Sequence, residues 1–177
     1  MKKIMQKGFT LVELLIVIAL LGALAIGLIG ALDPFEQLKK GTDTGTRNTV
    51  SEIQAALIRY YALKGFMPWC TSAGVCPSSP AGTKLNVAPM VNALVNVMNT
   101  GELKSNFTTV QSGELGKVWV TTDVDNLQAM VCYKPTAKSF QSDLNTVFKT
   151  EAGVKDDAAP LVCKSNGGAT DCWWCVQ

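Results

Sequence analysis

The most strongly patterned part of the chain is an uninterrupted apolar run from Leu14 to Leu32. A helix of this length is long enough to cross a bilayer hydrocarbon core about 30 Å thick. A short basic segment containing Lys2, Lys3 and Lys7 precedes the run and favours an orientation that keeps the N-terminus in the cytoplasm. We therefore predict that the chain spans the cytoplasmic membrane once, with its C-terminal part outside.

The pattern changes where the apolar run ends. Asp33-Pro34 interrupts it, because a proline within a helix removes a backbone hydrogen bond. Residues 41–46 (GTDTGT) have the composition of a loop or a frayed helix, which predicts a flexible joint. Residues 47–64 are then predicted to form an amphipathic helix that lies on a core. The apolar positions at helical spacing in this segment are Val50, Ile53, Leu57, Tyr60 and Tyr61.

The remaining sequence predicts a small head with one further helix and a sheet. Residues 68–82 are rich in proline and glycine and indicate an exposed loop around Cys70 and Cys76. Residues 87–99 show helical apolar spacing, with Pro89 in the first turn. Three segments rich in β-forming residues predict an antiparallel sheet, namely 117–122, 127–134 and 161–164. The expected fold class is α+β, with the amphipathic helix packed on a small, disulfide-stapled antiparallel sheet.

All cysteines follow the apolar run, as expected for a domain exported to an oxidising compartment. They are Cys70, Cys76, Cys132, Cys163, Cys172 and Cys175. A bond between Cys70 and Cys76 is the simplest local staple, and a Cys132–Cys163 bond could pin two predicted strands together. Cys172 and Cys175 could pair with each other or with other cysteines of the head. Because six cysteines allow 15 full pairings, the sequence leaves the connectivity open.

Candidate chemistry is sparse. The chain contains no His, which removes the commonest metal ligand and the usual general base near neutral pH. The C-x-x-C motif of Cys172 and Cys175 would suit a thiol oxidoreductase, but such a motif normally lies at a strand-to-helix turn, not close to the end of a sequence. A zinc site built from four of the cysteines is an equally weak alternative. We predict no catalytic residue, no cofactor and no metal site.

Residues 7–25, KGFTLVELLIVIALLGALA, resemble the class III signal of type IV pilins and type II secretion pseudopilins. The resemblance implies a type IV pilin-like fold, cleavage between Gly8 and Phe9 by a prepilin peptidase, and N-methylation of Phe9. The implied divisions are a leader over 1–8, a membrane-spanning and filament-core helix over 9–32, and a globular head over 33–177 that includes the amphipathic half of the helix.

Glu13 is the anomaly of the apolar segment. A carboxylate at the centre of a bilayer costs about 2.5–3.5 kcal/mol and persists mainly where it has a partner. Cleavage would create a positive amine on Phe9, so Glu13 of a neighbouring subunit could neutralise it as helices leave the lipid for a filament core. The alternative is a simple membrane anchor in which the Glu13 side chain reaches the headgroups.

These expectations lead to one main function, a non-enzymatic pilin that polymerises with itself into an extracellular filament for motility, adhesion or DNA uptake. The implied partners are the prepilin peptidase, the pilus assembly platform with its ATPase, and the membrane before assembly. The alternatives are a pseudopilin of a secretion or DNA-uptake machine and a membrane-tethered thiol oxidoreductase. Trp173 and Trp174 could be buried or form an adhesive tip, and contact with nucleic acid stays open.

Overall fold

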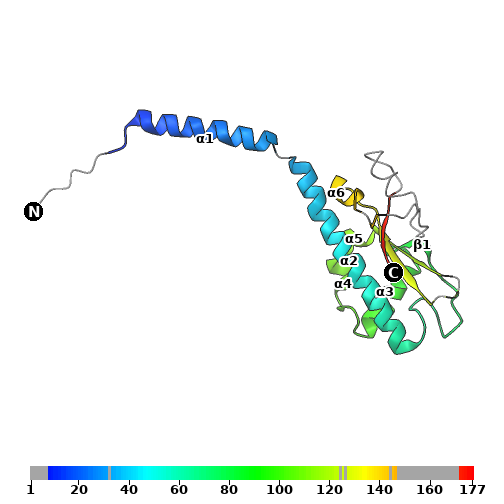
Figure 1. Cartoon of the computed structure of the whole chain (residues 1–177). Helices are drawn as coiled ribbons and strands as arrows, with labels where there is room; N and C mark the ends of the chain where they lie inside the picture. Colours follow the sequence, from blue (N-terminus) through cyan, green and yellow to red (C-terminus); the bar gives the residue numbers. More distant parts are fainter. Residues whose placement is uncertain (1–7, 32, 124, 126, 144, 147–171) are drawn as a thin grey trace, which may run out of the picture. The chain divides into compact units, whose positions relative to one another are not determined.

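The computed structural model describes residues 8–31, 33–123, 125, 127–143, 145–146 and 172–177 (Figure 1). The chain divides into two compact units, Met1–Gln37 and Leu38–Gln177. In chain order the elements are α1 (Leu11–Ala31), α2 (Pro34–Lys64), β1 (Ala81–Lys84), α3 (Met90–Asn99), α4 (Phe107–Val110), α5 (Ser112–Leu115), β2 (Val118–Thr122), β3 (Ala129–Tyr133), α6 (Lys138–Gln141) and β4 (Trp174–Val176).

α1 is the helix predicted from the early apolar run. Its segment Leu11–Gly30 has a mean hydropathy of 2.8 and is long and apolar enough to cross a membrane. At 1.5 Å per residue these 20 residues span about 30 Å, the thickness of a bilayer hydrocarbon core. Every residue from Gly8 to Gly30 is exposed in the structure. The apolar surface of α1 therefore has no partner in the described part of the chain.

At the predicted break, Asp33-Pro34, one helix has ended and a second helix begins. α1 ends at Ala31, and α2 starts at Pro34. Proline suits a first helical position, because its missing N–H would have no partner there in any case. The Asp33 carboxylate accepts a hydrogen bond from the backbone N–H of Glu36 at 3.2 Å, as a helix N-cap does. The change of helix is therefore fixed by local sequence.

The flexible joint predicted for residues 41–46 is wrong, because α2 runs without interruption from Pro34 to Lys64. The hydroxyls of Thr42 and Thr44 each donate to the carbonyl oxygen four residues earlier in the same helix. Asp43 and Thr46 are buried, and both also bond to other parts of the head. Such side chains favour loops when they compete for nearby backbone groups. Here tertiary partners and back-bonding along the helix remove that competition.

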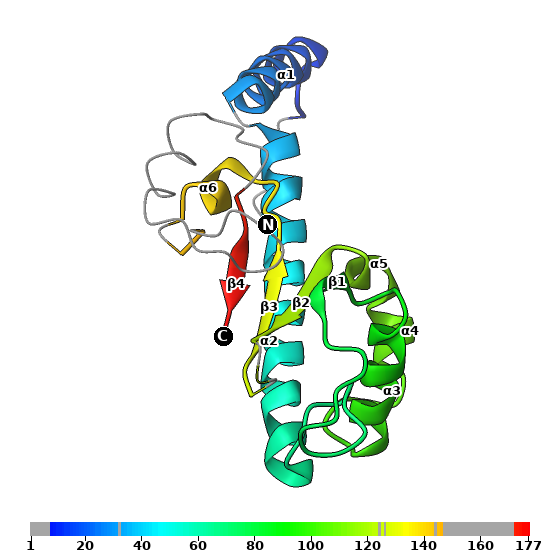
Figure 2. The ribbon, with the colours of Figure 1, turned by 90° about the vertical axis from the view of Figure 1, so that its right-hand side faces the viewer.

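The head core lies between α2 and a four-stranded antiparallel sheet with the order β1-β2-β3-β4. Figure 2 shows the strands alongside α2. Val50 and Ile53 of α2 are fully buried and belong to the same apolar cluster as Val118, Val120 and Val131 of the sheet. Complete burial of each such side chain contributes roughly 1.5–3 kcal/mol. The predicted α+β fold, with an amphipathic helix on a small antiparallel sheet, is confirmed.

β2 and β3 are the strands predicted for 117–122 and 127–134, and they pair antiparallel with Val118 opposite Tyr133. The strand predicted at 161–164 lies outside the described residues. β1 and β4 were not anticipated: β1 is a four-residue AGTK segment and β4 is a three-residue WCV segment, both too short to show an alternating pattern.

α3 is the helix predicted over residues 87–99, and it occupies Met90–Asn99. Pro89 takes the N-cap position instead of the predicted first turn. Met90, Leu94 and Val97 are buried in the core cluster, as their spacing indicates.

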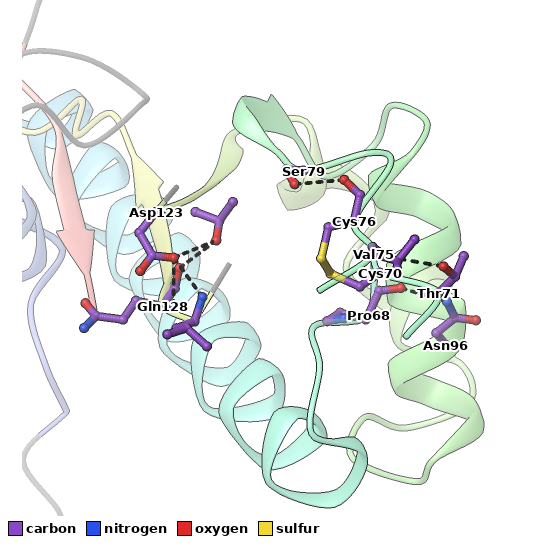
Figure 3. The surroundings of a disulfide bond; sticks show 11 residues. Pro68, Cys70, Thr71, Val75, Cys76, Ser79, Asn96, Asp123 and Gln128 are labelled. Carbon is purple, nitrogen blue, oxygen red and sulfur yellow. Dashed lines mark hydrogen bonds between the residues drawn. A yellow bond between two sulfur atoms is a disulfide. The ribbon is translucent and has the colours of Figure 1, made fainter. Parts of the chain in front are cut away.

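The loop after α2 is closed by the local disulfide that the sequence predicts. Gly65 ends α2 with a φ of 73°, a left-handed conformation that favours glycine, and its N–H donates to a carbonyl in the last turn. A disulfide joins Cys70 to Cys76, and the Asn96 side chain of α3 donates to the carbonyl oxygen of Pro68 at 2.9 Å (Figure 3). The loop is therefore fastened to α3 as well as to itself.

A second disulfide joins Cys132 to Cys175. The predicted Cys132–Cys163 bond is therefore wrong, and so is a bond between Cys172 and Cys175. The reason is the position of β4, which pairs with β3 and places Cys175 directly opposite Cys132. Cys172 is also disulfide-bonded. Cys163 lies outside the described residues.

We predict that the two disulfides contribute unequally to stability. Loop-closure entropy assigns about 4 kcal/mol to the Cys132–Cys175 bond, with its sequence separation of 43, and about 2 kcal/mol to Cys70–Cys76, with its separation of 6. The purified subunit with Ser at Cys132 and Cys175 should therefore lose more thermal stability, measured by circular dichroism, than the subunit with Ser at Cys70 and Cys76. An equal or reversed order would contradict the prediction.

Candidate functional site

The segment around the predicted cleavage position is accessible in the structure. Gly8 and Phe9 lie immediately before α1, and the Phe9 side chain is 81% exposed. Glu13, in the first turn of α1, is exposed as well. The three residues singled out by the sequence thus lie together at the start of the apolar helix.

Glu13 has a partner within its own chain. The backbone N–H of Thr10 donates to Oε2 of Glu13 at 2.9 Å, and the Thr10 hydroxyl donates to the same oxygen at 2.7 Å. The Glu13 N–H donates in turn to the Thr10 hydroxyl oxygen at 3.3 Å. This reciprocal arrangement is a capping box, which fixes the first turn of a helix. Sequence reasoning missed it, although the T-x-x-E spacing before an apolar run is its ordinary signal.

Asp43 fastens α2 to the chain after β3. Its carboxylate accepts hydrogen bonds from the backbone N–H groups of Thr136 (2.8 Å) and Ala137 (2.7 Å) and from the Thr136 hydroxyl (2.9 Å). Asp43 is 2% exposed. A buried carboxylate is tolerated when several donors satisfy its lone pairs, and removal of such a group leaves those donors unpaired. The side chain therefore sets the position of α2 along the sheet.

Arg47, one helical turn further on, connects α2 to the C-terminal strand. Its guanidinium donates to Asp143 at 3.1 Å and lies over the Trp174 ring, 4.4 Å from the ring centroid. The centroid of the Phe140 ring lies 5.7 Å from the same guanidinium. Cation–π contacts of this kind add to the apolar burial of the ring. β4 is thus held by α2 as well as by its pairing with β3.

Both C-terminal tryptophans are buried. Trp173 is 7% exposed and meets Trp119 edge to face at 4.6 Å between centroids. Trp174 is 8% exposed and packs against Tyr133 at 5.6 Å. Of the two readings left open by the sequence, the structure supports packing, and an exposed adhesive tip made of these rings is wrong.

Tyr133 is a buried side chain whose hydroxyl has no hydrogen-bond partner within the described residues. Burial raises the pKa of this hydroxyl, and the nearby Asp43 carboxylate raises it further. The hydroxyl therefore stays protonated across the physiological range, and the described residues offer it no acceptor.

Glu114, which precedes β2, joins the sheet to α2. It accepts hydrogen bonds from the Thr46 hydroxyl and from the Lys117 ammonium, the latter at 2.9 Å. Burial raises the pKa of the Glu114 carboxyl, but these two partners outweigh it, so the pKa lies below its usual value. The ionised carboxylate is the form that the fold prefers.

A cavity of about 650 Å³ lies on the head between α2 and the strands β2 and β3. We call it the lysine cavity, because Lys39, Lys117 and Lys134 lie along its wall. The wall also includes Asp43, Trp119, Tyr133 and Pro135. No local sequence pattern predicts this cavity, because its residues come from separate elements.

The structure argues against both cysteine-based sites that the sequence left open, a redox-active C-x-x-C pair and a zinc site. Cys175 is bonded to Cys132, so the C-x-x-C pair does not form the disulfide that a thiol oxidoreductase would use. Five cysteines are disulfide-bonded, which leaves too few thiols for a four-cysteine zinc site. Among the described residues no cluster of three His, Cys, Asp or Glu side chains is arranged to hold a metal.

Comparison with known proteins now adds to this geometry. Residues 3–29 match the family described as the prokaryotic N-terminal methylation motif. The chain is 30% identical over 172 residues to the type IV major pilin protein PilE of Neisseria gonorrhoeae, which covers 94% of this chain and 98% of that protein. The chain belongs to the type IV pilin family. The resemblance seen in the first residues thus extends over almost the whole pilin.

Two further relatives support the assignment. The type IV major pilin protein PilE1 of Neisseria gonorrhoeae is 29% identical over 166 residues, 92% of this chain and 96% of the relative. The fimbrial protein EcpC of Eikenella corrodens is 32% identical over 117 residues, 66% of this chain and 74% of the relative. These relatives are structural pilins, not enzymes. No solved structure matches the chain.

We predict that Tyr133→Phe stabilises the pilin head. An unpaired buried hydroxyl carries a desolvation cost of roughly 1–3 kcal/mol, which the change to phenylalanine removes while the ring contact with Trp174 stays. The free energy of unfolding in urea should rise by about 1 kcal/mol. A fall of similar size would show that the hydroxyl has a partner in solution.

We also predict an acid-sensitive contribution from Glu114. Because its pKa is lowered in the folded state, its stabilising effect is present above the usual carboxyl value and is lost as the pH falls through the folded-state pKa. Glu114→Gln should therefore lower stability at neutral pH and flatten its decline between about pH 5 and pH 3. The prediction is contradicted if the free energy of unfolding, measured in urea at each pH, falls equally with decreasing pH in the two proteins.

Proposed function

We propose that this chain is a pilin subunit that is cleaved between Gly8 and Phe9, is held in the cytoplasmic membrane by α1, and then assembles through α1 into an extracellular filament. The observation that carries the proposal is the exposed apolar helix with Glu13 in its first turn. The coverage of almost the whole major pilin PilE by this chain supports a structural, non-enzymatic role.

α1 needs an apolar environment that its own chain does not provide. Large apolar side chains are exposed along the helix, from Leu11 at 78% to Ile29 at 69%. A helix that is apolar on all sides is stable in lipid or among other apolar helices. Lipid before assembly and neighbouring α1 helices after assembly supply these two environments in turn.

Glu13 can take part in this transfer without giving up its local role. The described hydrogen bonds from Thr10 both reach Oε2, and Oε1 lies on the other side of the same carboxylate. In the proposed filament, Oε1 accepts from the α-amine that cleavage creates on Phe9 of an adjacent subunit. The charge pair then offsets the burial of two ions and sets the axial register of neighbouring helices.

A short secretion piston would use the same cleavage signal and the same Glu13. The abundance of the subunit in material sheared from cells separates the two assemblies, because a surface filament is released by shear and a periplasmic piston is not. We expect the subunit to be a major component of the sheared fraction.

We predict that Glu13→Gln blocks filament formation after normal processing. Glutamine can keep the capping box, but the Phe9 amine is then buried without a counter-charge. Loss of one partner of a buried ion pair costs about 3–5 kcal/mol, equivalent to a hundredfold or greater loss in the equilibrium for adding one subunit. Sheared filaments, quantified by immunoblot, should fall accordingly while the cell-associated subunit still migrates as the cleaved form.

Thr10→Val is the matched control, because it removes the capping hydroxyl and keeps the Glu13 charge. Loss of a helix cap costs about 1 kcal/mol, so filaments should persist. If Glu13→Gln assembles like the unaltered pilin, or if Thr10→Val is equally defective, charge pairing is not the basis of assembly.

A further inference from the structure

The lysine cavity has the size and lining of a binding site. Its volume of about 650 Å³ lies within the range of about 300–1,000 Å³ that is typical of small-ligand pockets. Trp119, Tyr133 and Pro135 supply apolar wall, while Lys39 and Lys134 supply ammonium groups. An apolar hollow with a few charged groups is the usual composition of such pockets.

The charge balance of the cavity favours an anion. Lys117 is paired with Glu114. The Asp43 carboxylate keeps its charge but accepts hydrogen bonds from Thr136 and Ala137, and Lys39 and Lys134 together outweigh that one negative charge. Within the part of the chain that the structure describes, Lys39 and Lys134 form no ion pair and are exposed.

Chain connectivity limits how far Lys39 can lie from a bilayer that α1 spans. α2 begins at Pro34, three residues after the end of α1, and Lys39 follows within the second turn of α2. At 1.5 Å per residue, Lys39 is about 7.5 Å along the helix from Pro34. The polar headgroup layer on each side of a bilayer is about 5–7.5 Å thick. In a subunit whose α1 spans the membrane, Lys39 comes eight residues after the end of α1, and a lysine side chain can extend back toward the headgroups.

We propose that the lysine cavity binds the phosphate headgroup of an anionic phospholipid while the subunit waits in the membrane. The proposal rests on the membrane-held stage of the proposed function. The phosphodiester lies between the ammonium groups of Lys39 and Lys134, and the glycerol carbons contact the Trp119 and Pro135 surfaces. Lysine is a common partner of phosphate, and aromatic side chains favour the membrane interface.

If the cavity binds a lipid headgroup, the head is docked on the membrane and must release the lipid before the subunit joins a filament. Docking through Lys39 and Lys134 adds to the membrane affinity that α1 supplies. Assembly removes the head from the bilayer and empties the cavity of lipid. Lipid composition would then influence the supply of subunits without any change in α1.

The test is native mass spectrometry of the mature full-length subunit, released from micelles that contain equal amounts of phosphatidylglycerol and phosphatidylcholine. The unaltered subunit should retain phosphatidylglycerol preferentially. Each lysine near an anionic surface contributes about fivefold in affinity, so the double variant Lys39→Gln, Lys134→Gln should lose about 30-fold of this preference. The preference should also fall with added salt, which screens exposed charges.

The matched control is the double variant Lys64→Gln, Lys104→Gln, which removes the same charge from exposed positions outside the cavity. It should keep the preference for phosphatidylglycerol. An equal loss in both double variants would overturn the proposal, because the effect would then be one of net charge.

Three other results would also overturn the proposal. Displacement of the lipid by inorganic phosphate at similar concentration would show a site for free phosphate. Charge-dependent dimers in the same spectra would show that a second copy occupies the cavity. Retention of both lipids equally would show that α1 alone holds them. The assembly proposal is tested separately by the yield of sheared filaments, so the absence of lipid binding would not contradict it.

Discussion

The apolar surface of α1 has to be covered, and the described part of the chain does not cover it. Side chains from Leu11 to Ile29 are exposed on a helix that carries one charged residue, Glu13. A surface of this kind is stable only in lipid or among other apolar helices. The head can fold while α1 lies in lipid or among other helices, because the described core residues of the head include none from α1.

Polar contacts add to the apolar core of the head by fixing the position of α2. Val50 and Ile53 give α2 an apolar face, but apolar packing alone would allow the helix to slide along the sheet. Asp43, Thr46 and Arg47 bond to three different parts of the head, namely the chain after β3, the segment before β2 and Asp143. Hydrogen bonds have directions and fixed lengths, so these contacts select one position of α2.

Much of the fold could be predicted because its signals are local. The apolar run, the break at Pro34, the helix ending at Lys64, α3 and the strands β2 and β3 all follow from patterns within short windows of sequence. The Cys70–Cys76 bond followed in the same way, from a short loop between the two cysteines.

The parts that could not be predicted depend on contacts between distant residues. Residues 41–46 look like a loop, and they are helical because Asp43 and Thr46 find partners more than sixty residues away in the chain. The Cys132–Cys175 bond follows from the pairing of β4 with β3, which three residues of sequence cannot reveal. The lysine cavity is likewise assembled from separate elements. The capping box of Thr10 and Glu13 is different, because its T-x-x-E spacing is a local signal that the sequence itself carries.

The most direct test of the account is the intact mass of the subunit taken from filaments on its native cells, together with the mass of its N-terminal peptide. We expect a chain that starts at Phe9 and carries one added methyl group on that residue. A chain that still starts at Met1, or one cut beyond Leu32 so that α1 is lost, would contradict it, because neither could bring a Phe9 amine and Glu13 together in a filament core.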